Sequence, residues 1–439
     1  MNLFFKKLTG RLHSTERMER QMMDDEERIV RYRQVEQSPE LKEYLELKKT
    51  IESKEFQQKK YNLTHTKYKK TPTYETIRQY KELLHNKQLQ QFIEIENSQR
   101  LKDYLKFRQS ENYIKLQSPK EVRNSLELKQ MATFENSKEY QSYLKYRDSK
   151  LPARFKALLE EVSTLEYKQQ HAFWSNPSRW KTTDEYQQEV RFKRLSEMAD
   201  IIFYLRQDRN EIERMQKMNA TFADEFDWNR MNESAWQAGF SYDNPKLLRQ
   251  HSFVNEQQAN NGGKNVGTVD NKLCLFTKKE KTTSPAWDPK KGFVSKDFDY
   301  TGDIIQTADQ FRQKGGLFMA KIRIEGNIHH AVWLGSDKKL PLISIFHYNG
   351  KHITVGNYGE KGFDGTIIRG ITPKSYYIYS LRWTDRELIW YVNNVEVYRT
   401  SHNIPQEKLY LAISSFIDEH QRPMEGKLNV AWVRVYTQD

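Results

Sequence analysis

Glycine is unevenly distributed along this chain of 439 residues, and that distribution strongly constrains the fold. Gly10 is the only glycine before Gly239, and the other seventeen of the 18 glycines lie from Gly239 onward. The glycine-poor part is rich in Glu, Lys, Gln, Leu and Arg, which favour helices. The glycine-rich part contains β-rich runs such as Leu317–Ile324 between clusters of turn residues. The sequence therefore predicts a multidomain protein, with an all-α region over residues 1–218 and a β-domain over residues 219–439.

A short pattern recurs in the helical part: an aromatic or small residue, then Leu, a variable position, an apolar residue and a base. Copies lie at 44–48, 104–108, 125–129 and 143–147, with a weaker copy at 189–193. The copies are unequally spaced, which predicts an irregular helical-repeat region and not a solenoid with one period. We interpret the resulting Tyr and Leu stripe as core packing. The alternative is a concave surface that binds a peptide, a partner protein or a second copy of the chain.

Several of these repeats open with a signal for the start of a helix. A hydroxyl residue that can cap free amides precedes a proline, which fits the first helical position, at Ser38-Pro39, Thr71-Pro72 and Ser118-Pro119. Ser98 and Ser137 are placed to cap two further helices. These repeated helix-start signals predict several short helices packed side by side.

The charge pattern argues against nucleic acid as the partner. The chain has 72 basic and 59 acidic residues, a net charge of +13. Residues 221–439 hold 28 basic and 25 acidic residues, and residues 1–220 hold 44 and 34. The two signs alternate closely in the helical part, which is typical of solvated helix faces.

Three other features of the sequence bear on membrane insertion, on cysteine chemistry and on cellular location. No apolar run of about 18 residues occurs, which predicts that the chain does not span a membrane. Cys274 is the only cysteine, so neither an intrachain disulfide nor a multi-cysteine metal site can form. The first ten residues lack the apolar stretch of a secretion signal, so we expect a cytoplasmic protein.

Short motifs rich in aromatic and β-branched residues follow one another from residue 221. They include Phe222-Ala-Asp-Glu-Phe226 with Trp236, and the segments 265–273, 300–307, 316–324, 331–334, 379–385, 389–394 and 433–436. In this order they resemble glycoside hydrolase family sixteen, the laminarinase, lichenase and agarase group. The resemblance covers about half of the chain and implies a concanavalin-like jelly roll, an antiparallel β-sandwich with a sugar-binding cleft.

The family hydrolyses β-glycans with two carboxylic acids and a helper Asp on one strand, spaced Glu-x-Asp-x-x-Glu or Glu-x-Asp-x-Glu. The matching segment here reads Pro341-Leu-Ile-Ser-Ile-Phe-His-Tyr348. The resemblance places Leu342 at the nucleophile position, Ser344 at the helper position and His347 at the acid/base position. Alternation puts the first two on one face, and a bulge residue turns the third to that face. Double displacement needs two carboxyl groups about 5 to 5.5 Å apart, so no intact catalytic residue is implied.

Other positions of the family cleft can be compared in the same way. Met319 stands where the family has a sugar-binding glutamate, and Lys321 where it often has arginine, which predicts a largely apolar cleft floor. Trp333 and Trp383 match positions in or beside the cleft. Because sugars stack on aromatic rings and need oriented donors, Trp333, Trp383 and His347 are the candidate carbohydrate-binding residues, for a β-linked polysaccharide or oligosaccharide.

The resemblance also bears on metals. Family members often hold a structural calcium near the last strand, where an Asp precedes the closing aromatic residue. Here that position is Ala431, so calcium is not expected there, although Asp224, Glu225 or Asp227 offer oxygens elsewhere. We predict no other cofactor.

These observations favour a non-catalytic protein whose helical region binds a partner or itself and displays a degenerate family-sixteen sandwich for carbohydrate binding or assembly. One alternative is a β-glycan hydrolase or transglycosylase with rearranged residues, in which Asp364 or Glu360 supplies a carboxylate and His347 the acid. Another is a structural component of a large particle, such as a phage or injection-type assembly.

Overall fold

The computed structural model of the protein describes residues 2–244 and 248–437, and the chain forms two compact units. The sandwich unit combines Met1–Gln34 with Arg206–Asp439, and the helical unit comprises Val35–Leu205. The predicted order of a helical region followed by an antiparallel sandwich is confirmed. The predicted boundary at residue 218 is wrong in two respects, because the first 34 residues and residues 206–218 belong to the sandwich unit.

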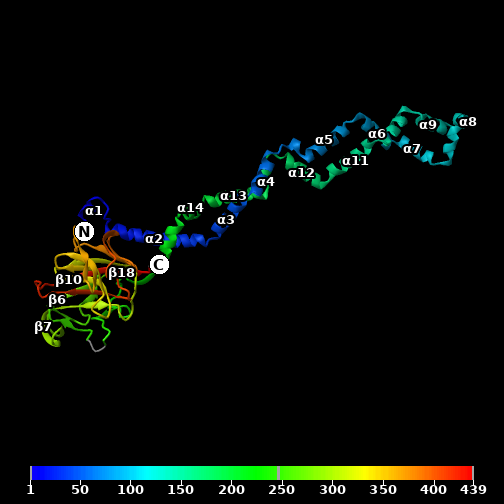
Figure 1. The fold of residues 1–439 in the computed structure, drawn as a ribbon. Helices are drawn as coiled ribbons and strands as arrows, with labels where there is room; N and C mark the ends of the chain where they lie inside the picture. The colour runs from blue at the N-terminus through cyan, green and yellow to red at the C-terminus, as the bar shows by residue number, and fades with distance from the viewer. Residues whose placement is uncertain (1, 245–247, 438–439) are drawn as a thin grey trace. The chain divides into compact units, whose positions relative to one another are not determined.

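The helical unit is a hairpin of two antiparallel rows of short helices (Figure 1). The first row runs through α3 (Pro39–Ile51), α4 (Lys54–His65), η1 (Tyr68–Lys70), α5 (Pro72–Leu84), α6 (Lys87–Asn97), α7 (Gln99–Arg108), η2 (Glu111–Gln117) and α8 (Pro119–Asn124). The second row returns through α9 (Leu126–Glu135), α10 (Lys138–Arg147), α11 (Lys150–Ser163), α12 (Leu165–Ser175), η3 (Arg179–Thr182), α13 (Asp184–Ser196) and α14 (Ala199–Arg206). Helix α3 packs on α13, α5 on α11, α6 on α10 and α7 on α9.

Aromatic pairs join the two rows at intervals. The ring centroids of Tyr44 and Phe192 lie 5.1 Å apart, and those of Phe92 and Tyr143 also 5.1 Å apart, both pairs stacked. Other pairs between the rows are Phe56 with Trp180 and Tyr80 with Phe155. Stacked aromatic pairs add specific attraction to apolar burial. The tyrosines of the repeat are therefore used for packing inside the helical unit. The prediction is wrong for the leucines Leu45, Leu105 and Leu126, whose side chains are exposed.

The predicted helix starts match the structure at most positions. Ser38 accepts a hydrogen bond from the Leu41 amide, and Thr71, Ser98 and Ser137 cap α5, α7 and α10 in the same way. Helix α8 begins at Pro119 as expected, but the Ser118 side chain makes no cap hydrogen bond. No helix in the described ranges is both long and apolar enough to cross a membrane.

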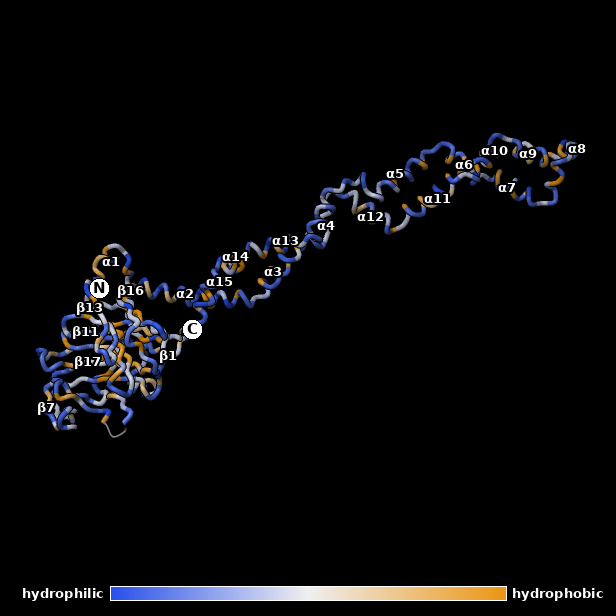
Figure 2. Tube along the Cα trace, viewed as in Figure 1, coloured by the Kyte–Doolittle hydropathy of each residue, from blue (hydrophilic) through white to orange (hydrophobic). Residues whose placement is uncertain are grey.

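The sandwich unit consists of two packed sheets. It also includes the helices α1 (Phe4–Leu8), α2 (Thr15–Glu36) and α15 (Arg209–Lys217). In the described residues the larger sheet has the order β16-β15-β14-β9-β18-β6-β7-β4, with β1, β3 and β5 at its side, and the smaller has the order β13-β12-β11-β10-β17-β8-β2. Figure 2 shows hydrophobic residues gathered in the sandwich, whereas hydrophilic residues predominate along the helices.

The strands of the larger sheet are β1 (Ala220–Asp224), β3 (Ser252–Phe253), β4 (Gln258–Asn260), β5 (Val266–Thr268), β6 (Leu273–Asp288), β7 (Gly292–Gly302), β9 (Gly316–Glu325), β14 (Tyr377–Trp383), β15 (Leu388–Val392), β16 (Val395–Thr400) and β18 (Gly426–Tyr436). Those of the smaller sheet are β2 (Gln237–Ala238), β8 (Ile304–Gln306), β10 (His329–Gly335), β11 (Leu342–Asn349), β12 (Ile353–Gly359), β13 (Gly362–Ile368) and β17 (Tyr410–Phe416). Pairing is antiparallel except for β3 with β6 and β4 with β7.

The amino-terminal segment is part of the sandwich core, which explains the shifted boundary. Leu3 is completely buried and Leu12 nearly so, and both belong to the main cluster of core residues. The Leu3 amide donates to the Arg369 carbonyl (2.7 Å), and the Thr15 hydroxyl donates to the Tyr376 carbonyl (2.7 Å). These few apolar residues are embedded in a charged segment, which is why composition assigned them to the helical part.

The start of α2 covers a face of the larger sheet. Met18 packs in one cluster with Met319 and Trp432. Glu19 accepts hydrogen bonds from the Lys321 ammonium group (2.8 Å) and from the Trp432 indole (2.9 Å). Met319 and Lys321 therefore contact the amino-terminal helix, and the prediction that they form the cleft floor is wrong.

Candidate functional site

Strand β11 carries the three residues that the sequence resemblance assigns to catalytic positions. Its pairing with β12 is irregular between Ser344 and His347, as expected for a bulge. This extra residue turns His347 to the same side as Leu342 and Ser344, and all three line one pocket. The predicted geometry of the strand is therefore confirmed, and the side chains at its three positions contain no carboxylate.

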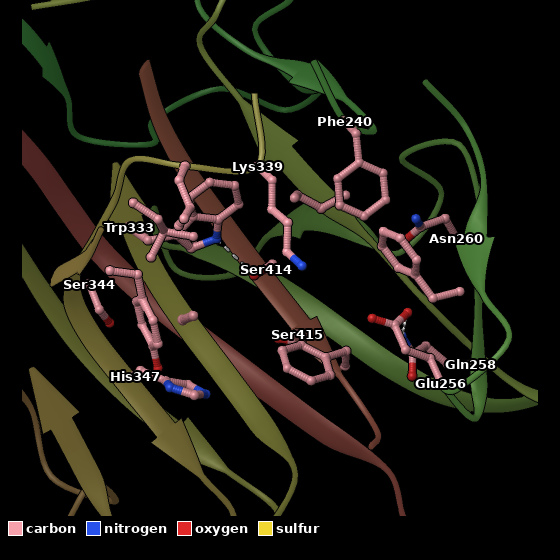
Figure 3. A pocket seen from close by; sticks show the side chains of 17 residues that line it. Phe240, Glu256, Gln258, Asn260, Trp333, Lys339, Ser344, His347, Ser414 and Ser415 are labelled. Atoms are coloured by element: carbon pink, nitrogen blue, oxygen red, sulfur yellow. Dashed lines mark hydrogen bonds between the residues drawn. The ribbon is translucent and has the colours of Figure 1, made fainter. Parts of the chain in front are cut away.

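The pocket has a volume of about 390 Å³ and lies on the smaller sheet. Strands β10, β11 and β17 contribute one wall, and the segment 253–260 with Phe240 contributes the facing wall (Figure 3). Its lining residues are Phe240, Phe253, Glu256, Gln258, Asn260, Ile304, Ala331, Trp333, Lys339, Leu340, Leu342, Ser344, His347, Tyr358, Ser414, Ser415 and Phe416. Aromatic surface combined with a few polar side chains is the usual composition of a small-molecule site.

His347 forms a pair with the histidine beside it on β10. A hydrogen bond joins Nδ1 of His329 to Nε2 of His347 (2.9 Å), and the His329 ring stacks on Phe416 (centroids 4.3 Å apart). Burial, with a smaller contribution from His329, lowers the pKa of His347 to about 4. Burial also lowers the pKa of His329. Both rings are therefore neutral at pH 7, and His347 is a positioned hydrogen-bonding group.

Trp333 is the aromatic platform of the β10 wall. Its indole N–H donates to the Ser414 hydroxyl (3.2 Å), and its ring packs obliquely against Tyr410. The side chain is half-buried and lines the pocket. A Cβ added to Gly335 would overlap this ring, so the glycine permits the ring's position. Trp333 and His347 are thus brought together in one pocket.

Trp383 does not reach the site. It lies on β14 in the larger sheet, its side chain is 1% exposed, and it belongs to the main core cluster beside Phe318. No lining residue of the pocket comes from β14. The prediction that Trp383 contacts a sugar is therefore wrong, because its ring points into the interior between the sheets.

The two carboxylates considered for a rearranged active site also lie elsewhere. Asp364 accepts hydrogen bonds from the hydroxyls of Tyr398 and Thr400 (2.6 Å for Thr400), and its place on β13 is outside the pocket lining. Glu360 lies in the exposed turn after β12. The structure brings neither residue to His347.

Glu256 is a lining residue that the sequence did not indicate. It follows β3 in a loop, and its carboxyl group accepts a hydrogen bond from the Gln258 side chain (2.9 Å). Burial raises the pKa of Glu256 to about 8. The local sequence Asn255-Glu-Gln-Gln258 matches no motif, so only the fold shows that this side chain faces the pocket.

Two of the three oxygen donors considered for calcium, Asp224 and Glu225, are engaged in other contacts in the described structure. The Asp224 carboxylate accepts hydrogen bonds from the indoles of Trp228 and Trp236 and from the Phe226 amide. Glu225 pairs with Arg434 (2.7 Å). Among residues 2–244 and 248–437, no group of three or more His, Cys, Asp or Glu is placed to hold a metal ion.

Comparison with solved structures finds similar sandwiches. A laminarinase catalytic domain from Thermotoga maritima is 15% identical over 51% of this chain and 99% of its own, with a TM-score of 0.41. An endo-β-1,3-glucanase from Pyrococcus furiosus is 16% identical over 50% and 94%, with a TM-score of 0.40. SCLam, a non-specific endo-β-1,3(4)-glucanase from family GH16, is 19% identical over 51% and 92%, with a TM-score of 0.41. No protein-family model and no curated protein sequence matches the chain.

Proposed function

We propose that the sandwich unit binds a β-linked oligosaccharide in the pocket on β11 without hydrolysing it by double displacement. The observation that supports this is the face of β11, where Leu342, Ser344 and His347 line one pocket beside the Trp333 ring. An apolar sugar face stacks on an indole ring, and neutral imidazole and hydroxyl groups orient the sugar hydroxyls.

The same face argues against the ordinary glycosidase reaction. Leu342 has no atom that can form a glycosyl-enzyme intermediate, and the neutral Ser344 cannot replace a carboxylate. His347 is paired with His329 and has a low pKa, so it holds no acidic proton at pH 7. The face of β11 thus retains groups that can bind a sugar and lacks the pair of carboxyl groups that double displacement needs.

The test is retardation of the full-length protein in native gels that contain laminarin or lichenan. The full chain is needed because a fragment that starts at residue 219 lacks the buried Leu3 and Leu12. We expect retardation that Trp333→Ala abolishes and Trp287→Ala preserves, since Trp287 lies at the β6–β7 turn outside the pocket lining. Equal retardation of both variants would contradict the assignment of the pocket.

A second assay separates binding from hydrolysis. The protein is incubated with the same glycans and new reducing ends are measured, with His347→Ala as the comparison. We expect none above the buffer control. Reducing ends that appear with the wild type and disappear with His347→Ala would favour the hydrolase or transglycosylase alternative.

The role of the helical unit, the cytoplasmic location and the particle-component alternative stay predictions. Light scattering of the full chain at micromolar concentration tests self-association. A strict monomer that captures no partner would count against both an assembly role and a particle component.

A further inference from the structure

Glu256 lies on the wall of the pocket that faces β11 (Figure 3). It is the only carboxylic acid among the described residues that line the pocket. Its side chain is half-buried, and acids withdrawn from water are rare unless they are paired with a cation or held by hydrogen bonds.

The loop that carries Glu256 is fixed by backbone contacts. The Lys296 ammonium group donates to the carbonyl oxygens of Val254 (2.7 Å) and Glu256 (2.8 Å). The Gln257 amide donates to the Ile417 carbonyl (2.9 Å), and the Gln257 side chain donates to the carbonyl of Asp418 (2.6 Å). The backbone of Glu256 is therefore positioned before any ligand binds, which reduces the entropy that binding has to overcome.

A second residue fixes the direction of the carboxyl group. The Ile417 amide donates to Oε1 of Gln258 (2.6 Å), so the amide nitrogen of Gln258 must point the other way. That nitrogen donates to Oε2 of Glu256 (2.9 Å). Oε1 of Glu256 accepts no side-chain hydrogen bond within the described part of the chain and is the oxygen left for a ligand, although the backbone amide of Phe253 also interacts with the carboxyl group.

The protonation of Glu256 follows from its surroundings. Burial is the main cause of its high pKa, about 8, and the Asp418 carboxylate adds to the rise. The hydrogen bonds from the Gln258 side chain and the Phe253 backbone amide, together with the positive charge of Lys296, oppose it. At pH 7 the group is mostly neutral, and because Oε2 accepts from Gln258, the proton resides on Oε1.

We propose that Glu256 contacts the ligand by donating a hydrogen bond from Oε1 to a sugar oxygen, opposite Trp333 and His347, and that the pocket selects an uncharged oligosaccharide. This inference rests on the proposed carbohydrate-binding function. The ligand then meets a neutral acid on one wall and a neutral imidazole with an indole on the other. Such neutral groups hold hydroxyl and ring oxygens, and the exposed Lys339 is the one cation among the described residues that line the pocket.

Calorimetric titration of the full-length protein with laminarihexaose between pH 5.5 and 9.5 tests the proposal. We expect constant affinity below pH 7 and a loss above pH 8, by about thirtyfold at pH 9.5 if only the protonated form binds. Glu256→Gln keeps a neutral donor, so its affinity should not fall with pH. Glu256→Ala should bind about tenfold more weakly at pH 6, the effect of one lost hydrogen bond.

Controls separate Glu256 from the other titratable groups that face it. Lys296 and Asp418 remain in Glu256→Gln, so any pH dependence that they cause would persist in that variant. Lys339 extends from the loop above the pocket, and Lys339→Met should keep the wild-type pH profile. His347, with a pKa of about 4, does not titrate in this range.

The outcomes distinguish the two proposals. If Trp333→Ala abolishes binding but the Glu256 variants behave as wild type, the inference about Glu256 fails and the proposed function stands. If the wild type binds no β-glucan hexasaccharide at any pH, both fail. A pH profile shared by the wild type and Glu256→Gln, or flattened by Lys339→Met, also overturns the inference.

Discussion

Replacement of Leu3 tests whether the amino-terminal segment is built into the sandwich. Leu3 is 0% exposed and lies in the main core cluster, whereas Leu8, five residues later, is 68% exposed. Leu→Ala at a fully buried position costs about 2 to 5 kcal/mol, from lost transfer free energy and the cavity that remains. We expect Leu3→Ala to lower the free energy of unfolding by about 3 kcal/mol and Leu8→Ala to change it by less than about 0.5 kcal/mol.

Urea unfolding followed by tryptophan fluorescence measures this difference. All of the nine tryptophans except Trp174 and Trp180 lie in the sandwich unit, so the signal reports mainly on that unit. With an m-value of about 3 kcal/mol/M, the midpoint of Leu3→Ala should fall by about 1 M. If Leu3→Ala and Leu8→Ala unfold at the same urea concentration, the segment does not belong to the core and the revised boundary is refuted.

Three other predictions follow from single contacts. Phe92→Ala removes a stacked, buried partner of Tyr143 and should lower the stability of the helical unit by about 3 kcal/mol, measured by far-UV circular dichroism during thermal unfolding. Glu256→Gln should be more stable than the wild type by about 4 to 5 kcal/mol at pH 9 and equal to it near pH 4, because the raised pKa removes stability as pH rises from about 4.5 to 8; a constant difference in urea unfolding would refute this. Gly335→Ala should displace the Trp333 ring and weaken laminarin retardation severalfold, whereas unchanged retardation would exclude a role for the ring's position.

Local signals in the sequence predicted the parts of the structure that depend on local geometry. Strand alternation placed Leu342 and Ser344 on one face, and the bulge implied by the family resemblance placed His347 with them, as the irregular β11–β12 pairing confirms. The helix starts at Ser38 and Thr71 follow from the same kind of short-range chemistry.

Contacts between distant segments were not accessible in this way. Trp383 has the strand pattern of a cleft residue, but the sheet in which β14 pairs and the face toward which its ring points are set by tertiary packing. Met319 was assigned to the cleft because it matches a family cleft position. Only the position of α2 shows that Met18 covers it. Glu256 carries no local signal, because its place depends on Lys296 and Gln258.

The pKa shifts of His347 and Glu256 in the pocket both favour the uncharged form of the side chain. Burial keeps the imidazole of His347 unprotonated and the carboxyl of Glu256 protonated, and Leu342 removes the charge that a nucleophile would bring. Cleavage of a glycosidic bond generates positive charge on the sugar, and a fixed carboxylate stabilises that charge. A pocket whose buried groups are neutral cannot provide this stabilisation, but it loses little free energy when a neutral ligand displaces its water. Under the proposed function, the neutral groups that argue against double displacement are therefore the same groups that would hold an uncharged sugar.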